Sequence, residues 1–458
     1  MSARASASAA VARAAGRASR LLGRGGGTSV PGVVLLKIDP GAVAELAARL
    51  GGGTALVSAT NGKTTTTRLL AGALRGAGSE VVTNAAGANL LTGVAATLAA
   101  ARPAVPVTAR GLFEVDEAAL PGVAERVRPQ VIVLMNLFRD QLDRHGELEA
   151  IADRWHDMLA VPGTGPRLVL AADDPAIAAL GAGHDVLWFG IDDDRVGQGA
   201  LPHAADSTRC RACSGPLAYE QVWIGHLGRW RCDACGNSRP ALDVAVTDAG
   251  LRGSAGSSPT IRTPDGDVTL QLDLPGLHNV LNAAAALAGA IALGVPAATA
   301  AEAISSVPAA FGRAERMQVD GRDLVLMLAK NPAGANENLR TLQLDPGEHD
   351  LLVALNDRIA DGRDVSWIWD VDWEPLLPRV RRLTATGERA HDLALRFRYA
   401  GLPADRLHVV ADHRAALSQA LAAVPEGGCL EVLPTYTAMH DIRADLVARG
   451  AAGEFWDD

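Results

Sequence analysis

The sequence predicts an α/β protein built from parallel sheets covered by helices, and three patterns carry this prediction. From Thr54 onward, short apolar runs alternate with stretches of helical periodicity, which is typical of strand–helix units in a parallel sheet. A second alternating block begins near Asp323 and indicates a separate, Rossmann-like α/β domain. Between the two blocks, residues 206–240 break this rhythm and contain four of the five cysteines, as an insertion would.

The length and composition fit a globular protein of two or three domains. The 458 residues are 48% hydrophobic and 21% charged, and the formal net charge of −9 excludes a global basic field that would recruit nucleic acid. No apolar run reaches the roughly 18 residues that span a bilayer, and the N-terminus lacks the compact apolar stretch of a secretory signal. We therefore expect a cytoplasmic protein, with peripheral contact to the inner face of the membrane left open.

The chain divides into three parts. Residues 1–50 are expected to be a helical segment, because small and apolar residues from Val11 to Leu22 recur at helical spacing. This stripe is mostly alanine, so we expect it to pack on the body of the protein, with a membrane surface as the alternative. Residues 51–320 are expected to form a central domain that carries the insert, and residues 321–458 a C-terminal domain.

The strands of both domains are expected at the short apolar runs. In the central domain these runs are Thr54–Ser58, Leu112–Val115, Val131–Asn136, Leu168–Ala171 and Val186–Phe189, followed by the more antiparallel Asp243–Thr247 and Val268–Leu274. A long helix is expected to begin near His278. In the C-terminal domain the runs are Leu324–Ala329, Leu351–Leu355, Arg381–Thr384, Leu407–Val410 and Leu430–Leu433.

A phosphate-binding loop is the first chemical motif. Ser-Ala-Thr-Asn-Gly-Lys-Thr-Thr-Thr-Thr follows the strand that ends at Ser58 and opens a helix, where backbone N–H groups can cradle phosphates. Lys63 can reach the β- and γ-phosphates, and the Thr64 hydroxyl can ligate Mg²⁺. The generic pattern fails at its first glycine, where Val57 stands, but the strand–loop–helix context favours ATP over a chance Gly-Lys-Thr. The expected ATP-binding residues here are Thr60, Asn61, Gly62, Lys63, Thr64 and Thr65.

Carboxylates follow a neighbouring strand. Glu114 lies at the end of the strand Leu112–Val115, and ligands of open parallel sheets gather at the carboxyl ends of strands. Mg²⁺ prefers carboxylates together with substrate phosphates, so Glu114 is a candidate magnesium ligand. For Asp116 and Glu117 we favour another role, as N-cap residues of the next helix.

The insert carries a metal-binding pattern. Cys210-x-x-Cys213 and Cys232-x-x-Cys235 are separated by 18 residues, and two such knuckles complete a tetrahedral thiolate shell for Zn²⁺. With no open ligand position, this zinc would be structural, and the aromatic residues of the spacer are expected to form the core of the ribbon. The remaining Cys429 lies in an apolar run and is expected to be a buried strand residue.

Taken together, the motifs resemble the Mur ligase superfamily. Thr-Asn-Gly-Lys-Thr-Thr is similar to the nucleotide loop of Mur ligases and folylpolyglutamate synthases, which usually have glycine where Ala59 stands. The segment 136–147 resembles the family's Asn-x-x-x-Asp-x-x-Asp-x-His element. By this resemblance Glu114 binds Mg²⁺. Further nucleotide or Mg²⁺ contacts are implied at Asn136, Asp140 and His145, at His278, Asn279 and Asn282 in Gly-Leu-His-Asn-Val-Leu-Asn, and at Arg313 in Phe-Gly-Arg.

Within the superfamily the chain is most similar to the MurT family. The Asp-Tyr-Ala-His element of amino-acid-adding Mur ligases is replaced by Met-Leu-Ala-Lys-Asn-Pro-Ala-Gly at residues 327–334, and its part Lys-Asn-Pro-Ala-Gly at residues 330–334 matches the MurT pattern. So do the long segment 356–370, the segment Pro-Thr-Tyr-Thr-Ala at 434–438 and the inserted ribbon. Only about fifty residues precede the phosphate loop, too few for a UDP-recognising domain of usual size. We therefore expect the protein to recognise its substrate through a group other than UDP.

The resemblance implies ATP-dependent amidation of D-glutamate in the stem peptide of lipid II, with ammonia from a partner glutaminase called GatD. In that scheme Asp364 is the catalytic acid supplied to the partner's Cys-His pair. Asp361 and Asp370 remain alternatives for the acid, as does a structural role in which Asp364 pairs with Arg363 or caps the next helix. The rival functions are a folylpolyglutamate synthase-like ligase and a nucleic-acid-binding ATPase that uses the ribbon. The C-terminal motif argues against the first and the acidic net charge against the second.

Overall fold

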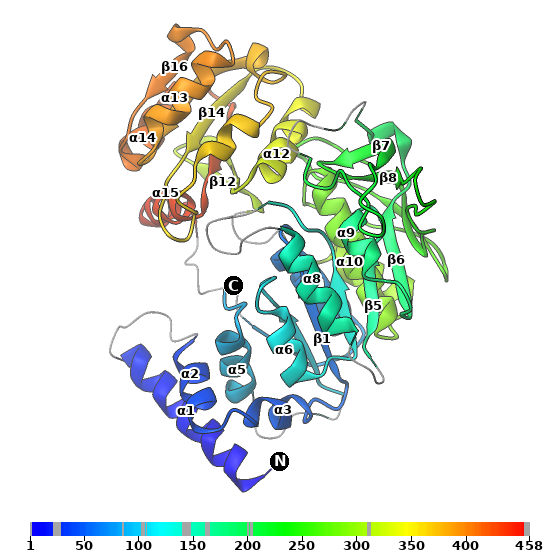
Figure 1. Ribbon diagram of the computed structural model, residues 1–458. Helices are drawn as coiled ribbons and strands as arrows, with labels where there is room; N and C mark the ends of the chain where they lie inside the picture. The colour runs from blue at the N-terminus through cyan, green and yellow to red at the C-terminus, as the bar shows by residue number, and fades with distance from the viewer. Residues whose placement is uncertain are drawn as a thin grey trace.

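The computed structural model of the chain describes residues 2–21, 29–84, 87–101, 106, 108–139, 148–160, 165–198, 201, 205–308 and 313–452. They form two large sheets, each flanked by helices, and a small two-stranded sheet (Figure 1). The predicted α/β class with two parallel-sheet domains is confirmed.

The central sheet has nine strands in the order β11-β10-β9-β6-β5-β4-β1-β3-β2. The strands from β2 to β9 pair in parallel, and the β10–β11 hairpin extends one edge antiparallel. Their bounds are β1 Thr54–Ser58, β2 Val81–Thr83, β3 Arg110–Glu114, β4 Val131–Leu134, β5 Arg167–Ala171, β6 Val186–Ile191, β9 Val244–Asp248, β10 Thr260–Thr263 and β11 Gly266–Thr269.

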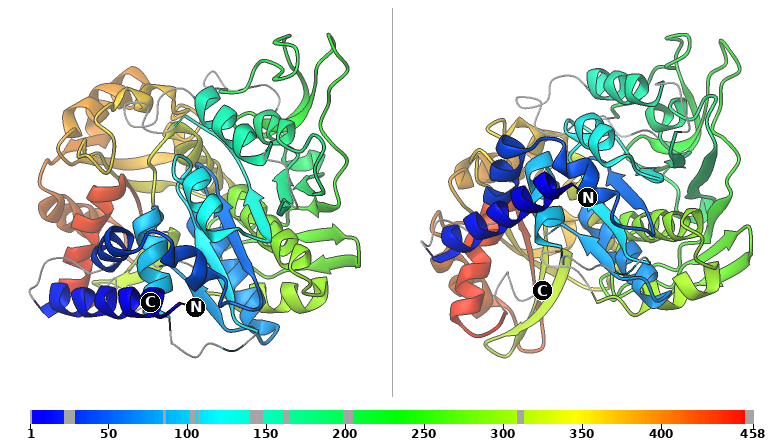
Figure 2. Two further views of the ribbon diagram at one scale, coloured as in Figure 1. Left: turned by 60° about the horizontal axis from the view of Figure 1, so that its bottom comes forward. Right: turned by 90° about the horizontal axis from the view of Figure 1, so that it is seen from below.

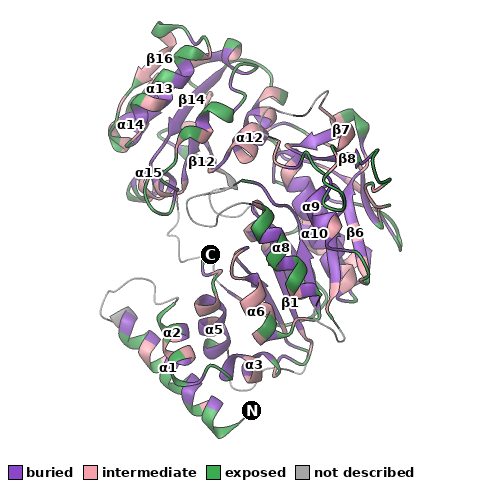
Figure 3. Cartoon of the chain, viewed as in Figure 1, coloured by how far each residue is buried: buried purple, intermediate pink, exposed green. Residues whose placement is uncertain are grey.

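Two layers of helices cover this sheet, and the inner strands β1, β3, β4 and β5 between them are largely buried (Figure 3). One layer packs α4 and α11 against the alanine-rich α10, whose inner positions are fully buried; the other contains α6 and α8. The helices of this domain are α4 Lys63–Gly76, α5 Leu91–Ala100, α6 Leu120–Val127, α8 Leu148–Leu159, α9 Pro175–Ala179, α10 Leu277–Ala292 and α11 Ala297–Ser305, with the 3-10 helix η1 Asp194–Val196.

The N-terminal segment forms three helices that pack beside α5: α1 Ala3–Leu21, α2 Val30–Ile38 and α3 Ala42–Ala47. Ala5, Ala9 and Ala12 of α1 are buried in the core of the central domain, so the helix packs on the body as expected. It does so through another face than the one predicted, because Val11, Ala14 and Ala18 of the predicted stripe are exposed. Figure 2 shows α1 lying along α2 at the edge of the molecule. Among the described residues, no helix is both long and apolar enough to cross a bilayer.

The C-terminal sheet has six strands in the order β12-β13-β17-β14-β15-β16, all parallel except for the β12–β13 hairpin. It begins at Arg313, ahead of the boundary at residue 320 suggested by the sequence. The strands are β12 Arg313–Val319, β13 Arg322–Met327, β14 His349–Ala354, β15 Val380–Thr386, β16 Leu407–Val409 and β17 Cys429–Pro434. The helices are α12 Pro332–Leu344, η2 Ser366–Asp370, η3 Leu377–Arg379, α13 Ala390–Tyr399, η4 Ala404–Arg406, α14 His413–Ala423 and α15 Tyr436–Ala448.

The structure differs from the strand predictions in several places. The run Asp243–Thr247, expected to be antiparallel, forms β9, which pairs in parallel with β6 and antiparallel with β10, and β10 itself was not expected. The run Val268–Leu274 forms a strand only in part, since β11 ends at Thr269. Strands β2 and β12 were not expected: β2 has only three residues, and β12 carries charged residues instead of an apolar run. Both are strands because they pair along the edge of a sheet whose neighbours are already fixed.

Candidate functional site

The phosphate loop lies between β1 and α4, as the sequence predicts. Gly62 precedes α4 with a φ of 90°, a left-handed conformation that suits glycine. A Cβ atom at this position would come within 2.0 Å of the side-chain oxygen of Asn282, so any other residue would have to displace that side chain as well as adopt a strained backbone conformation. Thr64 is half-buried at the start of α4, and Thr65 is buried behind it.

Lys63 is held at this loop by a buried carboxylate. Its Nζ lies 2.8 Å from Oε2 of Glu117 and also donates to the carbonyl oxygen of Ala59. Burial alone would raise the pKa of Glu117, but the charges of Lys63 and Lys330 beside it hold that pKa below its ordinary value. The interpretation of Glu117 as a helix N-cap was therefore wrong, because α6 begins only at Leu120.

Asn136 shapes the loop from the end of the neighbouring strand β4. Its side-chain oxygen accepts from the N–H of Asn61 at 2.9 Å, and its Nδ2 donates to the carbonyl oxygen of Asn61 at 3.0 Å. Next to it, the Thr60 hydroxyl accepts from the N–H of Phe138 at 3.0 Å. Because both backbone groups of Asn61 are bound, Asn136 fixes the shape of the loop, and its side chain is committed to that task.

Helix α10 brings the predicted asparagines to the same place. The Nδ2 of Asn282 donates to Oδ1 of Asn279 at 3.1 Å, and the Thr66 hydroxyl donates to the carbonyl oxygen of Asn282. Asn279 also donates to Pro275, one turn back. His278 is half-buried at the N-terminal end of the helix, close to Gly276. The structure thus places Asn282 against the phosphate loop.

Glu114 lies at the carboxyl end of β3, and a residue that the sequence analysis missed holds it. The side chain of Asn84 accepts from the N–H of Glu114 at 3.0 Å and donates to its carbonyl oxygen at 2.9 Å. The side chain of Glu114 is buried. It lies close enough to Tyr436 of the C-terminal domain to act on its pKa, which is raised first by burial and then by the charges of Asp361 and Glu114. A carboxylate at this strand end, next to the phosphate loop, fits the donor preference of Mg²⁺.

The C-terminal domain reaches the phosphate loop through Lys330 and Asn331. The Nζ of Lys330 lies 3.4 Å from the carbonyl oxygen of Thr60, and Nδ2 of Asn331 donates to Oδ1 of Asn61 at 3.0 Å. Asn331 is also the N-cap of α12, since its Oδ1 accepts from the N–H of Gly334 at 2.9 Å. Sequence reasoning recognised this motif but gave neither residue a role.

Three predicted residues cannot be placed. Asp140 and His145 lie outside the described residues. Arg313 is the first residue of β12, and its side chain also lies outside the described part of the chain. Their proposed nucleotide or magnesium contacts therefore stay predictions.

Glu337 of α12 is a buried carboxyl at the face of this helix that meets the central domain. It shares that face with Arg340, which donates to the carbonyl oxygen of Trp223 at 2.7 Å, and with Thr341. Glu337 is 3% exposed, and Arg340 is its nearest cation at 3.8 Å. Burial raises the pKa of Glu337 to about 7, although Arg340 opposes this shift.

This shift gives a prediction for stability. The pKa of Glu337 is raised from 4.5 to about 7 in the folded state. Its contribution to the free energy of unfolding is therefore fully present below pH 4.5 and is lost as the pH rises through 7. Glu337→Gln should therefore stabilise the protein at pH 8.5, by up to about 3 kcal/mol, and have little effect at pH 4.5. Melting temperatures at both pH values test this, with the exposed Glu426→Gln as control. Equal effects at both pH values would contradict it.

Asp364 lies in the loop after β14, on the surface of the C-terminal domain. It is exposed, and its Oδ1 accepts from the N–H of Ser366 at 2.9 Å; the hydrogen bonds from Ser366 hold the pKa of this carboxyl below its usual value. The alternative Asp361 is buried, and its carboxylate accepts from the N–H and the hydroxyl of Thr437. Asp370 is exposed at the end of η2. Asp361 is thus occupied in holding α15, whereas Asp364 faces solvent.

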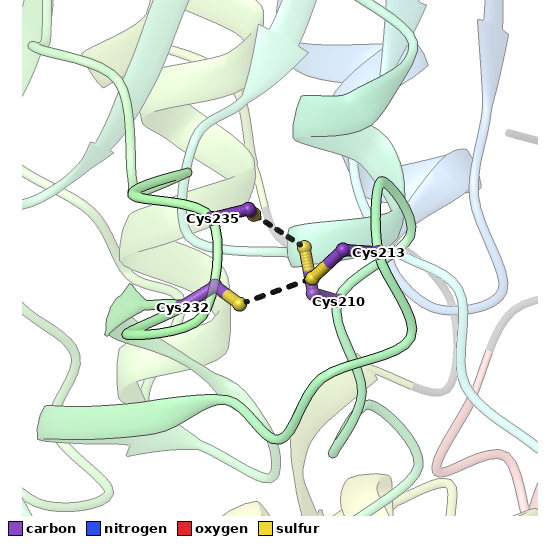
Figure 4. Close-up of side chains that lie close together, drawn as sticks. All are labelled: Cys210, Cys213, Cys232 and Cys235. Atoms are coloured by element: carbon purple, nitrogen blue, oxygen red, sulfur yellow. Dashed lines mark hydrogen bonds between the residues drawn. The ribbon is translucent and has the colours of Figure 1, made fainter.

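The four cysteines of the insert meet as predicted. Their sulfur atoms all lie within 4.8 Å of one another, with Cys210 and Cys235 at 3.7 Å and Cys213 and Cys232 at 3.5 Å (Figure 4). Among the described residues, this is the one group of three or more His, Cys, Asp or Glu side chains arranged to hold a metal ion. Four sulfur donors without an oxygen ligand fit a closed structural site for Zn²⁺.

The aromatic residues of the insert do more than fill a ribbon core. The hairpin of β7 Ala218–Ile224 and β8 Leu227–Arg231 carries Trp223 and Trp230, both buried. Their indole N–H groups donate to the carbonyl oxygens of Asp193 and Ala172 in the central domain, at 3.0 Å each. The insert is therefore anchored to the central sheet.

Metal analysis of the purified protein should give about one zinc per chain. Cys213→Ser should lower the zinc content and the melting temperature together, because it removes one of four ligands. Cys429→Ser is the matched control, since Cys429 lies far along the chain in β17. A zinc-free protein, purified without chelator and melting as usual, would refute the assignment.

A cavity of about 450 Å³ lies apart from the phosphate loop, at the amino end of the C-terminal sheet. It is lined by His349 and Glu431, which form a buried pair at 3.2 Å, and by charged residues around them. None of the predicted ATP-site residues lines this cavity, so the nucleotide site is assigned by the loop geometry and not by the size of a cavity.

Comparison with known proteins identifies the family. Residues 57–230 match the family described as Mur ligase middle domain, and residues 328–439 match the one described as MurT ligase C-terminal. The subunit MurT of lipid II isoglutaminyl synthase (glutamine-hydrolyzing) from Streptococcus pneumoniae is 33% identical over 441 residues, which covers 95% of this chain and 96% of that protein. The chain belongs to the MurT family. It is therefore a ligase of the Mur type, and ligation by this family depends on ATP.

Other relatives agree. The MurT subunit from Staphylococcus aureus strain N315 is 30% identical over 392 residues, covering 85% of this chain and 86% of that protein. Among solved structures, a pseudomurein peptide ligase type C from Methanothermus fervidus aligns with a TM-score of 0.68 at 20% identity, covering 86% of this chain and 78% of that one. MurF from Acinetobacter baumannii aligns at 0.66 and 18% identity, covering 91% and 80%. These structures show that the chain has the Mur ligase fold.

Proposed function

We propose that this chain is the synthetase subunit of a lipid II isoglutaminyl synthase. It would amidate the α-carboxyl group of D-glutamate in the lipid II stem peptide, giving D-isoglutamine. The observation that carries this proposal is the 33% identity, over 95% of the chain, to a MurT subunit whose name states that activity.

The reaction needs ATP because a free carboxylate is a poor electrophile. In the first step the carboxylate oxygen attacks the γ-phosphorus of ATP, an acyl-phosphate forms and ADP leaves. In the second step the lone pair of ammonia attacks the carbonyl carbon, phosphate leaves with the C–O bonding electrons, and the nitrogen loses a proton. The chain supplies positioning and charge for both steps.

The phosphate loop supports the first step. We assign the triphosphate to the N–H groups of residues 62–65 at the start of α4, because those of Thr60 and Asn61 already donate to Asn136. Lys63 would also bind the triphosphate and must exchange Glu117 for phosphate oxygens when the nucleotide binds. Asn279, Asn282 and Arg313 are proposed as further nucleotide contacts. Mg²⁺, held by Thr64 and Glu114, would neutralise phosphate charge when bound.

The nitrogen source is proposed to be a GatD-like glutamine amidotransferase that docks on the C-terminal domain. An aromatic patch near Asp364 supports this site: Trp369 and Tyr399 are 46% and 75% exposed, with ring centroids 5.6 Å apart, and Leu395 beside them on α13 is 51% exposed. Exposed aromatic residues of this kind are enriched in protein interfaces. Asp364 would orient the partner's histidine from this surface.

The first step can be tested with the complex of this chain and its partner in an assay without glutamine. With lipid II, Mg²⁺ and ATP present, hydroxylamine should trap the acyl-phosphate as a hydroxamate on the stem peptide, with one ADP formed per hydroxamate. ADP release without hydroxamate, or hydroxamate without ATP, would contradict the acyl-phosphate route. The reaction would take place at the cytoplasmic face of the membrane, where the lipid carrier holds the substrate.

A further inference from the structure

Helix α12 contacts both places that the proposed reaction uses. At its start, the N-cap Asn331 donates to Asn61 of the phosphate loop at 3.0 Å. Within its first two turns, Oδ1 of Asn336 accepts from the N–H of Asp372 at 2.8 Å, and its Nδ2 donates to the carboxylate of Asp372 at 3.3 Å. One helix therefore binds the nucleotide loop and the segment that follows Asp364.

The segment after Asp364 also rests on α12 through apolar contacts. Ile368 and Val371 are buried in the same cluster as Ala335, Leu339 and Leu342 of the helix. The other end of that segment is Asp364 itself, held by the N–H of Ser366 at the start of η2. The position of Asp364 is thus set by a segment whose packing surface is α12.

The contacts at the two ends are suited to transmit a small shift. A helix of 13 residues is a rigid body about 20 Å long, so displacing its first turn moves the whole helix. The pair Asn61–Asn331 is uncharged and the carboxylate of Asp372 is exposed, so breaking either contact leaves no buried charge behind. Arg340, bonded to the carbonyl oxygens of Trp223 and Val196, gives α12 a second attachment to the central domain, away from the loop.

We propose that Asn331 and Asn336 are positioning residues, and that α12 couples nucleotide binding at the phosphate loop to the orientation of Asp364. With nucleotide in the loop, Asn61 and Asn331 place α12 so that Asp364 supports glutamine hydrolysis by the partner. Without nucleotide, hydrolysis is slow and glutamine is spared. This inference rests on the proposed function.

The experiment measures glutamine hydrolysis by the intact complex with and without Mg²⁺ and a non-hydrolysable ATP analogue. The wild-type rate should rise on nucleotide binding by a factor within the usual range of such couplings, about 5–150. Asn331→Ser keeps a side-chain oxygen for the N-cap but cannot reach Asn61, so it should bring the ratio of the two rates close to one. Asn61→Ala should do the same. The double variant should lower the ratio no further, because the two substitutions remove the same contact between Asn61 and Asn331.

Asn336→Ala should lower the ratio through the other end of the helix, by reducing kcat for glutamine hydrolysis in the presence of nucleotide. Gln343→Ala, on the same helix but at neither contact, is the control and should keep the ratio. Melting temperature and complex formation are measured for every variant. A wild-type complex whose glutaminase ignores nucleotide, or a ratio unchanged in Asn331→Ser and Asn336→Ala, would overturn the coupling. A complex with no glutaminase activity at all would instead overturn the proposed function.

Discussion

Replacing Lys63 by alanine is expected to lower ATP turnover by at least about 100-fold, because the variant loses the cation that stabilises charge on the transferring phosphoryl group. Its amine is fixed at the loop by Glu117 and by the carbonyl oxygen of Ala59. The measurement is ADP release with lipid II and ammonium present. Arg75→Ala, which removes an exposed cation from the last turn of the same helix, should keep wild-type turnover.

Stability must be separated from catalysis in this experiment. Lys63→Ala leaves Glu117 buried without its main partner, which is costly in a protein interior. The double variant Lys63→Ala/Glu117→Gln removes that charge and should melt closer to the wild type while remaining inactive. Normal ATP turnover in either well-folded variant would refute the nucleotide assignment.

Asp364→Asn should reduce glutamine-dependent amidation by about 10⁴-fold, the loss seen in a catalytic triad when its acid becomes an amide. Ammonium-driven amidation should continue, because it bypasses the glutaminase. Complex formation should also continue, since the change is isosteric on an exposed loop. The measurement compares the two nitrogen sources in the same reconstituted complex.

Two neighbouring aspartates serve as controls. Asp370→Asn removes an exposed carboxylate from the other end of η2 and should keep glutamine-dependent activity. Asp361→Asn should instead lower the melting temperature, because this carboxylate holds the start of α15. Full glutaminase activity in Asp364→Asn, or its loss in Asp370→Asn, would show that Asp364 is not the acid.

The parts of the site that the sequence predicted are contiguous in the chain. The phosphate loop occupies a single stretch between a strand and a helix, and the spacing of the two Cys-x-x-Cys pairs by itself predicts a metal site. Both patterns encode their own geometry locally, so no knowledge of the tertiary structure is needed. The apolar runs of buried parallel strands were equally readable, because such strands are buried on both faces.

What the sequence could not show are contacts between distant segments. Glu117 is 54 residues from Lys63, and Asn331 is 270 residues from Asn61. Glu117 follows a strand and precedes a helix, where an N-cap is the ordinary expectation; only the folded sheet shows that it faces the neighbouring loop. A signal was nevertheless present for Asn331, because its motif replaces the segment that carries Asp and His in related ligases.

The most direct measurement follows one nitrogen atom. Lipid II, ATP, Mg²⁺ and glutamine labelled with ¹⁵N in its side-chain amide are given to the complex of this chain with its glutaminase partner, and the stem peptide is analysed by mass spectrometry. We expect ¹⁵N in the α-carboxamide of the D-glutamyl residue, with one ADP and one phosphate formed per amide. ATP consumption with an unlabelled, unamidated stem peptide, or label on any other carboxyl group, would contradict the assignment of this chain as the amidating subunit.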